Sequence, residues 1–535
     1  MSLLMWLILA AAVKHVWLVL TLLLPAAIIL PLEVWGRVSL GAPSSAQSVA
    51  LVFETTAAEA ANFLLTYGTA LLLSWGGWLA FYFCTLYLSW RSRLSWSHRS
   101  RLPFLVTALF ALFLFHSSSS ASHWLKVQQE TDPLGGLKFS GWSQQWADVY
   151  PVNLAIASQE YVLQKDKIEE IRGALERQIV DSRILDPLVA ADVVVLVIGE
   201  SSTATHWGLL GYERKTTPAL QSRAHIIAFS DAVGLSVATR AAVPGVLSRA
   251  PVLTPAGKVN SAAQPSLVRA FSQAGYRTHW LSNQAPFGKH DTAISVYAGE
   301  ADEVRFLNPS TYRYRGSYDE VLLLPLRDIL QEPGRHFIVL HTLGSHFNYA
   351  MRYPQEHDYF GVDDGNEDAR SFEQKRLDAY DNSIRYTDYI LDNVIKLLEV
   401  RNDSSMLMYF SDHGVDPPQG KCALGVTERG SEDAYHVPVV VWASDVMRGR
   451  KPRQWDTLVK HKDMPYTMRA LMPALYALSG ITVRYKDEVD QNREYVESFL
   501  SAPDLQARPR MVAFGDKMID FDLAREKNAC RISAQ

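Results

Sequence analysis

Hydrophobic and polar positions divide the chain into two regions with different patterns. Before residue 120, long apolar runs occur at Val16–Leu32, Phe63–Trp90 and Leu102–Phe115. From Ala191 onward, short continuous apolar runs alternate with longer stretches in which apolar residues recur every three to four positions. The first pattern indicates membrane helices. The second indicates buried strands alternating with helices, as in an α/β domain.

The three apolar runs of the first region predict three transmembrane helices. Lys14 and the basic loop Arg91–Arg101 flank these runs, so we expect both sites to be cytoplasmic and the chain after residue 120 to lie outside the inner membrane. The stretch Glu33–Arg37 lacks a small-residue cleavage pattern, which favours an uncleaved anchor over a signal peptide. Residues 1–13 suit either an interfacial helix or a fourth, hairpin-like piece.

Composition narrows the class of protein. The chain has 535 residues, of which 48% are hydrophobic and 20% charged, so it can bury a large core in more than one domain. Its net charge of -4 argues against a nucleic-acid partner, which would require a basic face. Of the three cysteines, Cys84 falls in the second apolar run, which leaves Cys422 and Cys530 to form at most one disulfide.

A connector is expected between the two regions, at residues 123–187. Its second half, Gln159–Ile184, places apolar residues on one helical face among mixed charges. Such a helix can pack on the globular domain or rest on the bilayer surface. The mixed charges favour packing, because surface helices on membranes are usually basic.

The second region predicts parallel strands, because runs that do not alternate are typical of strands covered on both faces. The expected strands are Val193–Ile198, His336–His341, Leu407–Phe410 and Val437–Trp442. The expected helices are Ser266–Ala274, Ser371–Leu398 and Met468–Leu478.

Polar side chains follow three of these strands. Glu200 ends the first, His341 and His346 mark the second, and the pair Asp412-His413 follows the third. The carboxyl ends of parallel strands are where ligands of such sheets usually bind. Glu200, Asp412 and His413 supply oxygen and nitrogen ligands suited to zinc or a similar divalent ion.

A nucleophile is expected in the small-residue stretch Gly234–Ser248, which holds Ser236 and Thr239 ahead of Pro244. An alcohol is a weak nucleophile near neutral pH, and a bound divalent cation can stabilise and orient its alkoxide. A hydroxyl in such a stretch is usually structural. The three metal-ligand residues elsewhere in the chain favour the catalytic interpretation.

Five motifs occur along the chain in a fixed order: VIGES…GYERKTTPAL, ATRAAVP, WLSNQAPFGKHD, HTLGSHFNYAMRYP and YFSDHG. This ordered set resembles the membrane-bound phosphoethanolamine transferases of the alkaline phosphatase/sulfatase superfamily. In the first region, the segment Glu54–Ala60 resembles the short acidic loop that these enzymes carry between spans. The resemblance covers roughly residues 50–480.

The resemblance implies a mechanism and a set of site residues. Thr239 would attack the phosphorus of phosphatidylethanolamine, diacylglycerol would leave, and the phosphoethanolamine-threonine intermediate would pass its group to an outer glycolipid or glycan such as lipopolysaccharide. Glu200, Thr239, Asp412 and His413 match the family's zinc shell. The substrate-facing residues implied by the resemblance are Asn283, Gln284, Lys289 and His346.

The chain departs from the family pattern after the Asp-His-Gly motif. Many relatives have Glu next and a further His about a dozen residues on, whereas this chain has Val415 and its next histidine is His436. His436 either fills that role as a substrate-binding residue or opens a strand with its side chain bonded to the backbone. The family's lipid A enzymes usually have five spans and several periplasmic disulfides, whereas this chain has about three expected spans and two available cysteines. The acceptor is therefore not determined by the resemblance.

The expected architecture is an α/β protein of four parts: transmembrane helices at 1–122, a periplasmic linker at 123–187, an α/β/α sulfatase-like catalytic domain at 188–490, and a C-terminal tail at 491–535. The protein would be a zinc-dependent transferase of the bacterial inner membrane, in contact with membrane lipid, with its catalytic domain in the periplasm. The alternatives are a phosphoglycerol transferase, another sulfatase-fold hydrolase and a catalytically silent membrane scaffold. A formylglycine sulfatase is disfavoured, because Ala238–Ala242 lacks the required C/S-x-P-x-R motif.

Overall fold

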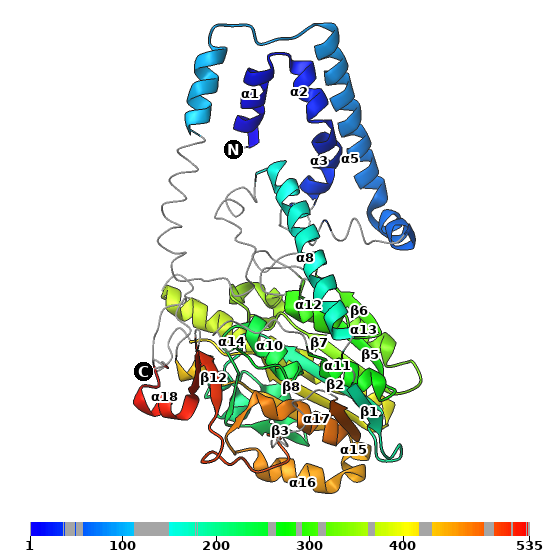
Figure 1. The fold of residues 1–535 in the computed structure, drawn as a ribbon, viewed down its shortest axis with the longest axis vertical. Coiled ribbons are helices and arrows are strands. Elements are labelled where there is room, and N and C mark those ends of the chain that lie inside the picture. The colour runs from blue at the N-terminus through cyan, green and yellow to red at the C-terminus, as the bar shows by residue number, and fades with distance from the viewer. Residues whose placement is uncertain are drawn as a thin grey trace. The chain divides into compact units, whose positions relative to one another are not determined.

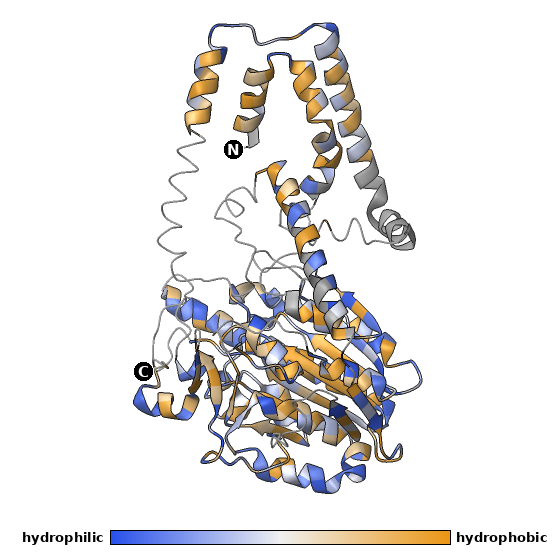
Figure 2. Ribbon diagram, viewed as in Figure 1, coloured by the Kyte–Doolittle hydropathy of each residue, from blue (hydrophilic) through white to orange (hydrophobic). Residues whose placement is uncertain are grey.

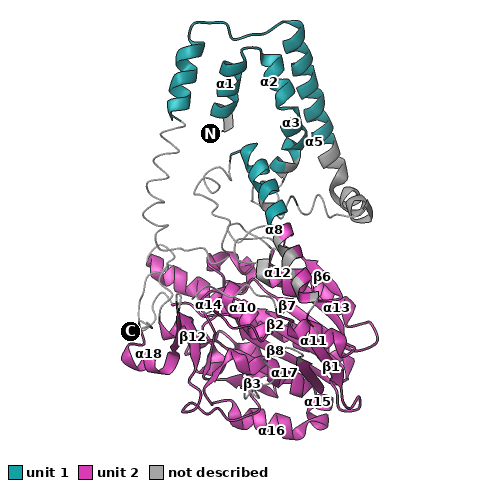
Figure 3. Cartoon of the chain, in the orientation of Figure 1, with its two compact units in different colours: residues 1–165, 309–314 teal, residues 166–308, 315–535 magenta. Residues whose placement is uncertain are grey.

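The computed structural model shows the fold in Figure 1. The residues that it describes are 2–35, 37, 49, 57–111, 149–176, 178, 180–254, 264–284, 292–308, 317–361, 370–416, 431–485, 497–514, 517–530 and 532. The chain divides into two compact units, which Figure 3 colours separately: residues 1–165 with 309–314, and residues 166–308 with 315–535. Each unit is described by itself.

The first unit is helical and largely apolar (Figure 2). Its named helices in the N-terminal part are α1 (Ser2–Val13), α2 (Val16–Leu22), α3 (Leu24–Trp35) and α5 (Ala57–Arg91). A further helical stretch lies at 101–111. No helix among the described residues combines the length and apolar character needed to cross a membrane.

Polar atoms of α5 attach it to the two helices before it. The indole nitrogens of Trp75 and Trp78 donate to the carbonyls of Ile28 and Ala27, at 2.9 and 2.8 Å, and the Tyr82 hydroxyl donates to Leu20 at 2.6 Å. The expected single run Val16–Leu32 is divided into α2 and α3 at Leu23. Pro25 explains the break, because it has no N–H to continue the hydrogen-bond ladder.

The second unit is built on a seven-stranded sheet with the order β3-β9-β8-β2-β7-β5-β6. Three neighbouring strands match the expectations closely and run parallel, with β2 between the other two. The strands are β2 (Val193–Gly199), β3 (Ile226–Phe229), β5 (Arg277–Ser282), β6 (Glu303–Phe306), β7 (His336–His341), β8 (Ser405–Ser411) and β9 (Val439–Ala443).

The sheet is covered on both faces, because alternate side chains of β2 belong to two different cores. Val194, Leu196 and Ile198 pack into one cluster, and Val193, Val195 and Val197 into the other. Each fully buried aliphatic side chain contributes about 1.5–3 kcal/mol, which explains the unbroken apolar run of this strand. The first face is covered by α10 (Thr239–Leu247), α11 (Leu267–Gln273) and α17 (Leu471–Ser479), and the second by α13 (Leu323–Ile329) and α14 (Phe372–Arg401). An α/β/α domain is therefore present.

Two expectations for strands and helices are wrong. The segment expected as a fourth parallel strand is β9, which runs antiparallel to β8 and to β3. Its first residue therefore lies at the same sheet edge as the last residues of the parallel strands. The expected helix Gln159–Ile184 is α8 (Val152–Glu176) followed by β1 (Val180–Ile184), which pairs antiparallel with β11 (Ile481–Tyr485). As a result, the side chains of β1 alternate over its first four residues between buried and more exposed positions.

The C-terminal end of α8 belongs to the second unit and packs on α11 of that unit. Leu175 is buried, and its carbonyl accepts a hydrogen bond from Arg269 of α11 at 2.6 Å. This contact supports the packing interpretation for that part of the connector. Near the other end of the chain, Cys530 is disulfide-bonded and Cys84 is free. Cys422, its expected partner, lies outside the described residues.

Candidate metal and nucleophile site

Three ligand residues meet at the carboxyl ends of the two central strands. Gly199 and Ser411 are register partners in β2 and β8, so Glu200 and Asp412 leave the sheet side by side. Ligand atoms of Glu200, Asp412 and His413 lie within 4.8 Å of one another, and all three residues are buried. These are the three metal ligands that the strand-end pattern predicts.

The donor set fits a divalent cation. Burial raises the pKa of Glu200, and the neighbouring Asp412 raises it further. Burial also raises the pKa of Asp412, whose Oδ2 accepts no hydrogen bond. Two buried carboxylates this close need a cation to be charged together. Nδ1 of His413 lies 2.7 Å from the carbonyl of Gly414, which makes Nδ1 the donor and leaves the Nε2 lone pair for a metal.

Thr239 faces these ligands. Its Oγ1 lies 3.2 Å from Glu200 Oε2 and 3.3 Å from His413 Nε2. Thr239 is the first residue of α10, where unpaired backbone N–H groups and the helix dipole favour an anion. Ser236 is arranged differently, because its hydroxyl accepts from the N–H of Ala238 at 3.3 Å. The geometry therefore favours Thr239 over Ser236 as the nucleophile.

Glycines allow the backbone to approach the ligands closely. A Cβ on Gly199 would lie 2.4 Å from the Tyr409 hydroxyl, and one on Gly414 would lie 2.1 Å from the carbonyl of Asp433. Gly344 has φ +50, and its Cβ would lie 2.8 Å from both the N and the O of Glu200. The segments at the ends of β2, β7 and β8 can therefore approach one another around the site only because these three positions are glycines.

Two residues that support the ligands were not expected from the sequence. Ser201, at φ +57, donates from its hydroxyl to Glu200 Oε1 at 2.6 Å and from its N–H to Asp412 Oδ1 at 3.0 Å. Tyr380 donates to the carbonyl of Ser201 at 3.1 Å. Ser201 could have been found from its position beside Glu200. Tyr380 lies within a long helix, where an aromatic residue carries no functional signal.

The expected substrate residues fall into different environments. His346 is partly buried, and its charge lowers the pKa of Glu200, so it lies near the metal ligands. Asn283 is buried and donates to Asp319 Oδ1 at 2.8 Å, while Gln284 donates to the carbonyl of Thr342 at 2.6 Å. Both amides thus hold neighbouring loops. Lys289 lies outside the described residues.

The structure shows the backbone-bonded alternative for His436. Its Nε2 lies 2.8 Å from the carbonyl of Ser230, and its own carbonyl accepts from the N–H of Ala204 at 3.0 Å. His341 is not part of the cluster of metal-ligand residues. Its Nδ1 lies 3.1 Å from the Ser282 hydroxyl, and burial lowers its pKa to about 3. His341 is therefore a neutral core histidine.

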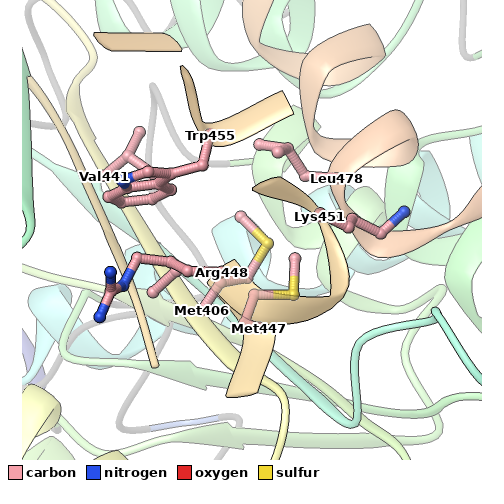
Figure 4. A pocket seen from close by; sticks show the side chains of 8 residues that line it. Met406, Val441, Met447, Arg448, Lys451, Trp455 and Leu478 are labelled. Carbon is pink, nitrogen blue, oxygen red and sulfur yellow. The ribbon is translucent and has the colours of Figure 1, made fainter. Parts of the chain in front are cut away.

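An apolar pocket lies at the other end of β8 from Asp412 (Figure 4). Met406, Val441, Met447 and Trp455 contribute to its lining. Burial lowers the pKa of Lys451 at this pocket, and its amine donates to the carbonyl of Ala477 at 3.0 Å. The lining contains no carboxylate or histidine, so this pocket does not resemble a metal site.

Comparisons with known proteins agree with this geometry. A family model described as Sulfatase matches residues 192–474, more than half of the chain. The chain is 30% identical over 319 residues to the phosphoethanolamine transferase EptC of Escherichia coli K12, covering 57% of this chain and 53% of that protein. It is 35% identical over 261 residues to the putative transferase YhbX of the same strain, covering 48% and 44%. The chain spans about half the length of these curated relatives.

A solved structure gives the same fold. The crystal structure of the C-terminal periplasmic domain of E. coli EptC in complex with Zn matches with a TM-score of 0.56 and 25% identity. The match covers 66% of this chain and 99% of that domain.

Proposed function

This chain belongs to the sulfatase family, and from that premise we propose that it is a zinc-dependent phosphoethanolamine transferase. The donor is phosphatidylethanolamine, and the acceptor is an envelope glycolipid or glycan such as lipopolysaccharide, in its lipid A or core. One observation carries the proposal: the Thr239 hydroxyl lies 3.2 Å from Glu200 Oε2 and 3.3 Å from His413 Nε2, within a buried cluster of metal-ligand residues.

The first half-reaction uses Thr239 as the nucleophile. Its Oγ1 loses its proton and forms a bond to the donor phosphorus while the bond from phosphorus to the diacylglycerol oxygen breaks. The diacylglycerol oxygen takes up one proton in turn, so diacylglycerol leaves as the neutral alcohol. Glu200, Asp412 and His413 would hold zinc, which would favour deprotonation of the Thr239 hydroxyl and neutralise phosphate charge. The first N–H groups of α10 and the side chain of His346 would stabilise the negative charge that develops on the phosphate.

The second half-reaction restores the enzyme. A hydroxyl or phosphate oxygen of the acceptor forms a bond to phosphorus, the bond to Thr239 Oγ1 breaks, and the threonine regains its proton. Covalent catalysis of this kind divides one difficult displacement into two easier ones. Lys289 and the loop of Asn283 and Gln284 belong to the proposed substrate side of the site.

The proposed location follows from the donor. From the three apolar runs of the sequence, we propose that the first region anchors the chain in the bacterial inner membrane by three spans, with the catalytic domain in the periplasm. The acyl chains of the donor then stay in the membrane while its phosphate reaches Thr239. No nucleotide is required, because the bond energy comes from the phospholipid itself.

The covalent intermediate provides the test. Purified full-length protein, loaded with zinc and incubated with phosphatidylethanolamine, should gain the mass of one phosphoethanolamine group on the peptide containing Thr239. Thr239→Ala should gain none while retaining its fold and zinc, because it removes one hydroxyl and little core volume. Ser236→Ala should gain the group as the wild type does.

Two results would change the assignment. An adduct that survives in Thr239→Ala and disappears in Ser236→Ala would move the nucleophile to Ser236. An adduct of phosphoglycerol from phosphatidylglycerol, with none from phosphatidylethanolamine, would make the protein a phosphoglycerol transferase. Absence of any adduct from either lipid in zinc-loaded protein would refute the transferase function and favour the scaffold alternative.

A further inference from the structure

The C-terminal part of the chain, expected as a tail, is folded against the catalytic machinery. Beyond the region that matches the sulfatase family, β12 (Met511–Phe514) and β13 (Lys517–Asp520) form an antiparallel hairpin, followed by α18 (Phe521–Lys527). Val512, Phe521 and Ala524 from this segment share a core cluster with Val233 and Tyr435. We call residues 510–514 and 517–530 the C-terminal clamp.

The clamp contacts the middle of the loop that leads to the nucleophile, residues 234–238, and also the residue that precedes β4 (Ala232–Val233), the strand before this loop. Arg510 is almost fully buried and joins Asp231, just before β4, to Asp522 of α18. Its Nη1 lies 2.6 Å from Asp231 Oδ1. In the middle of the loop, the N–H of Ala513 donates to the carbonyl of Leu235 at 2.8 Å, and Ser236 pairs with Ala513 as a parallel bridge.

Tyr435 connects the clamp to both sides of the site. Its hydroxyl donates to the carbonyl of Ala513 at 3.0 Å, and its own carbonyl accepts from the N–H of Gly234 at 2.7 Å. The adjacent Ala434 accepts from the N–H of Gly414, directly after the metal ligand His413. The backbone of residues 434–435 therefore joins the loop before Thr239 to the segment after the ligands, and the Tyr435 hydroxyl ties that backbone to the clamp.

Thr239 depends on this loop for its position. β4 (Ala232–Val233) ends before the loop, and α10 begins at Thr239 itself, so regular secondary structure does not hold the five residues between them. The metal ligands Glu200 and Asp412, by contrast, follow the central strands β2 and β8 directly. The ligands and the nucleophile are thus positioned by separate parts of the fold.

We propose that the C-terminal clamp sets the position of the Thr239 hydroxyl relative to the metal ligands, with Tyr435 and Arg510 as positioning residues. The inference rests on the proposed role of Thr239 as the nucleophile. Removing a contact of the clamp leaves the ligand set in place and moves the attacking oxygen. Displacements of about 1 Å from a productive geometry can lower a rate by about 100-fold.

The mildest test is Tyr435→Phe, which keeps the buried ring and removes the hydroxyl that donates to Ala513. We expect kcat for transfer to fall about 10-fold, with KM for phosphatidylethanolamine and the zinc content unchanged. Tyr276→Phe is a matched control, because it also removes a buried hydroxyl. That hydroxyl donates to the carbonyl of Ala191 at 2.8 Å, and Ala191 is not part of the loop. Its kcat should equal that of the wild type.

A second measurement does not depend on transfer. Amide hydrogen exchange of peptides covering residues 234–238 should be faster in Tyr435→Phe and in Arg510→Lys than in the wild type, and unchanged in Tyr276→Phe. A wild type that transfers nothing refutes the proposed function, while exchange still tests the clamp. The clamp is refuted if exchange of the loop is unchanged in both variants, or if kcat and zinc content fall together in Tyr435→Phe.

Discussion

Replacing Gly344 by alanine should distort the candidate metal site although Gly344 is not one of its ligands, because the new side chain would press on Glu200. Gly344 follows β7, and its φ of +50 is one that residues with a side chain rarely adopt. The added Cβ would lie 2.8 Å from both the backbone N and O of Glu200, and 3.2 Å from its Cβ. Backbone atoms at the end of a central strand cannot rotate away, so either Glu200 or the loop of Gly344 must move.

The expected cost has two parts. The left-handed backbone conformation costs an alanine about 1–2 kcal/mol. Overpacking against the backbone of Glu200 adds about 1–3 kcal/mol. The free energy of unfolding should therefore fall by roughly 2–5 kcal/mol. Zinc should bind about 10-fold more weakly, because supporting residues around a ligand typically contribute 10- to 100-fold to metal affinity.

The assay measures both quantities on full-length protein. Urea denaturation of the protein after removal of metal by a chelator gives the loss of stability. Competition with a chromophoric chelator gives the zinc affinity. Gly275→Ala is the matched control: its φ is +91, and no atom lies within 4 Å of the built Cβ. The control should lose about 1–2 kcal/mol through its backbone alone and bind zinc as the wild type does.

The comparison between the two variants decides the result. Equal losses of stability with unchanged zinc affinity in both would mean that Gly344 matters only through its backbone conformation. In that case the close approach to Glu200 would not hold the ligand, and the reasoning would be refuted.

Three further predictions concern charge and topology. Burial raises the pKa of Asp388 from 3.8 to about 6. The protonated carboxyl therefore stabilises the folded state below about pH 4, and this contribution is lost as the pH rises through 6. Asp388→Asn should remove about 3 kcal/mol of the fall in stability over this window, measured by urea midpoints from pH 4 to 7. Arg214 pairs with Asp378 and Asp381, both buried. Asp378 also pairs with Arg370, and Asp381 with His206 and Tyr212. Arg214→Met should therefore cost about 1.5–3 kcal/mol in thermal or urea unfolding by removing one of several partners, and a loss below about 0.5 kcal/mol would contradict this. A reporter active only outside the cytoplasm should be active when fused after Gln535 and silent after Ser97; the reverse pattern would place the catalytic domain in the cytoplasm.

The ligand set could be predicted from the sequence because its signals are local. Each ligand directly follows a strand whose continuous apolar run is visible in the sequence, and parallel neighbours bring those ends together. The register of β2 with β8 places Glu200 beside Asp412 as this argument requires. The expected start of a helix at Ser371 also agrees with the structure, in which Ser371 caps α14 by accepting from the N–H of Gln374.

Features that depend on distant pairing could not be predicted in the same way. The direction of β9 depends on its connection to β8 rather than on its residues, and the same apolar run serves either direction. β1 follows a helical pattern without a break in composition, and only its partner β11 makes it a strand. The position of His436 follows from that reversal: the residues that precede β9 lie at the sheet edge where Glu200 and Asp412 leave their strands, while the His436 imidazole bonds to the carbonyl of Ser230.

The sheet order has a consequence for how the protein matures. Ser201 and Asp412, joined at the site by a hydrogen bond, are separated by 211 residues of chain. Closing a loop of that length costs about 5 kcal/mol of chain entropy. A zinc ion therefore cannot act as an early template, as it does in small metal-stabilised domains whose ligands are close in sequence. During synthesis from the N-terminus, Glu200 forms before Asp412 is available. The metal site would therefore be completed only when β8 pairs with β2, so metal binding would follow formation of the central sheet.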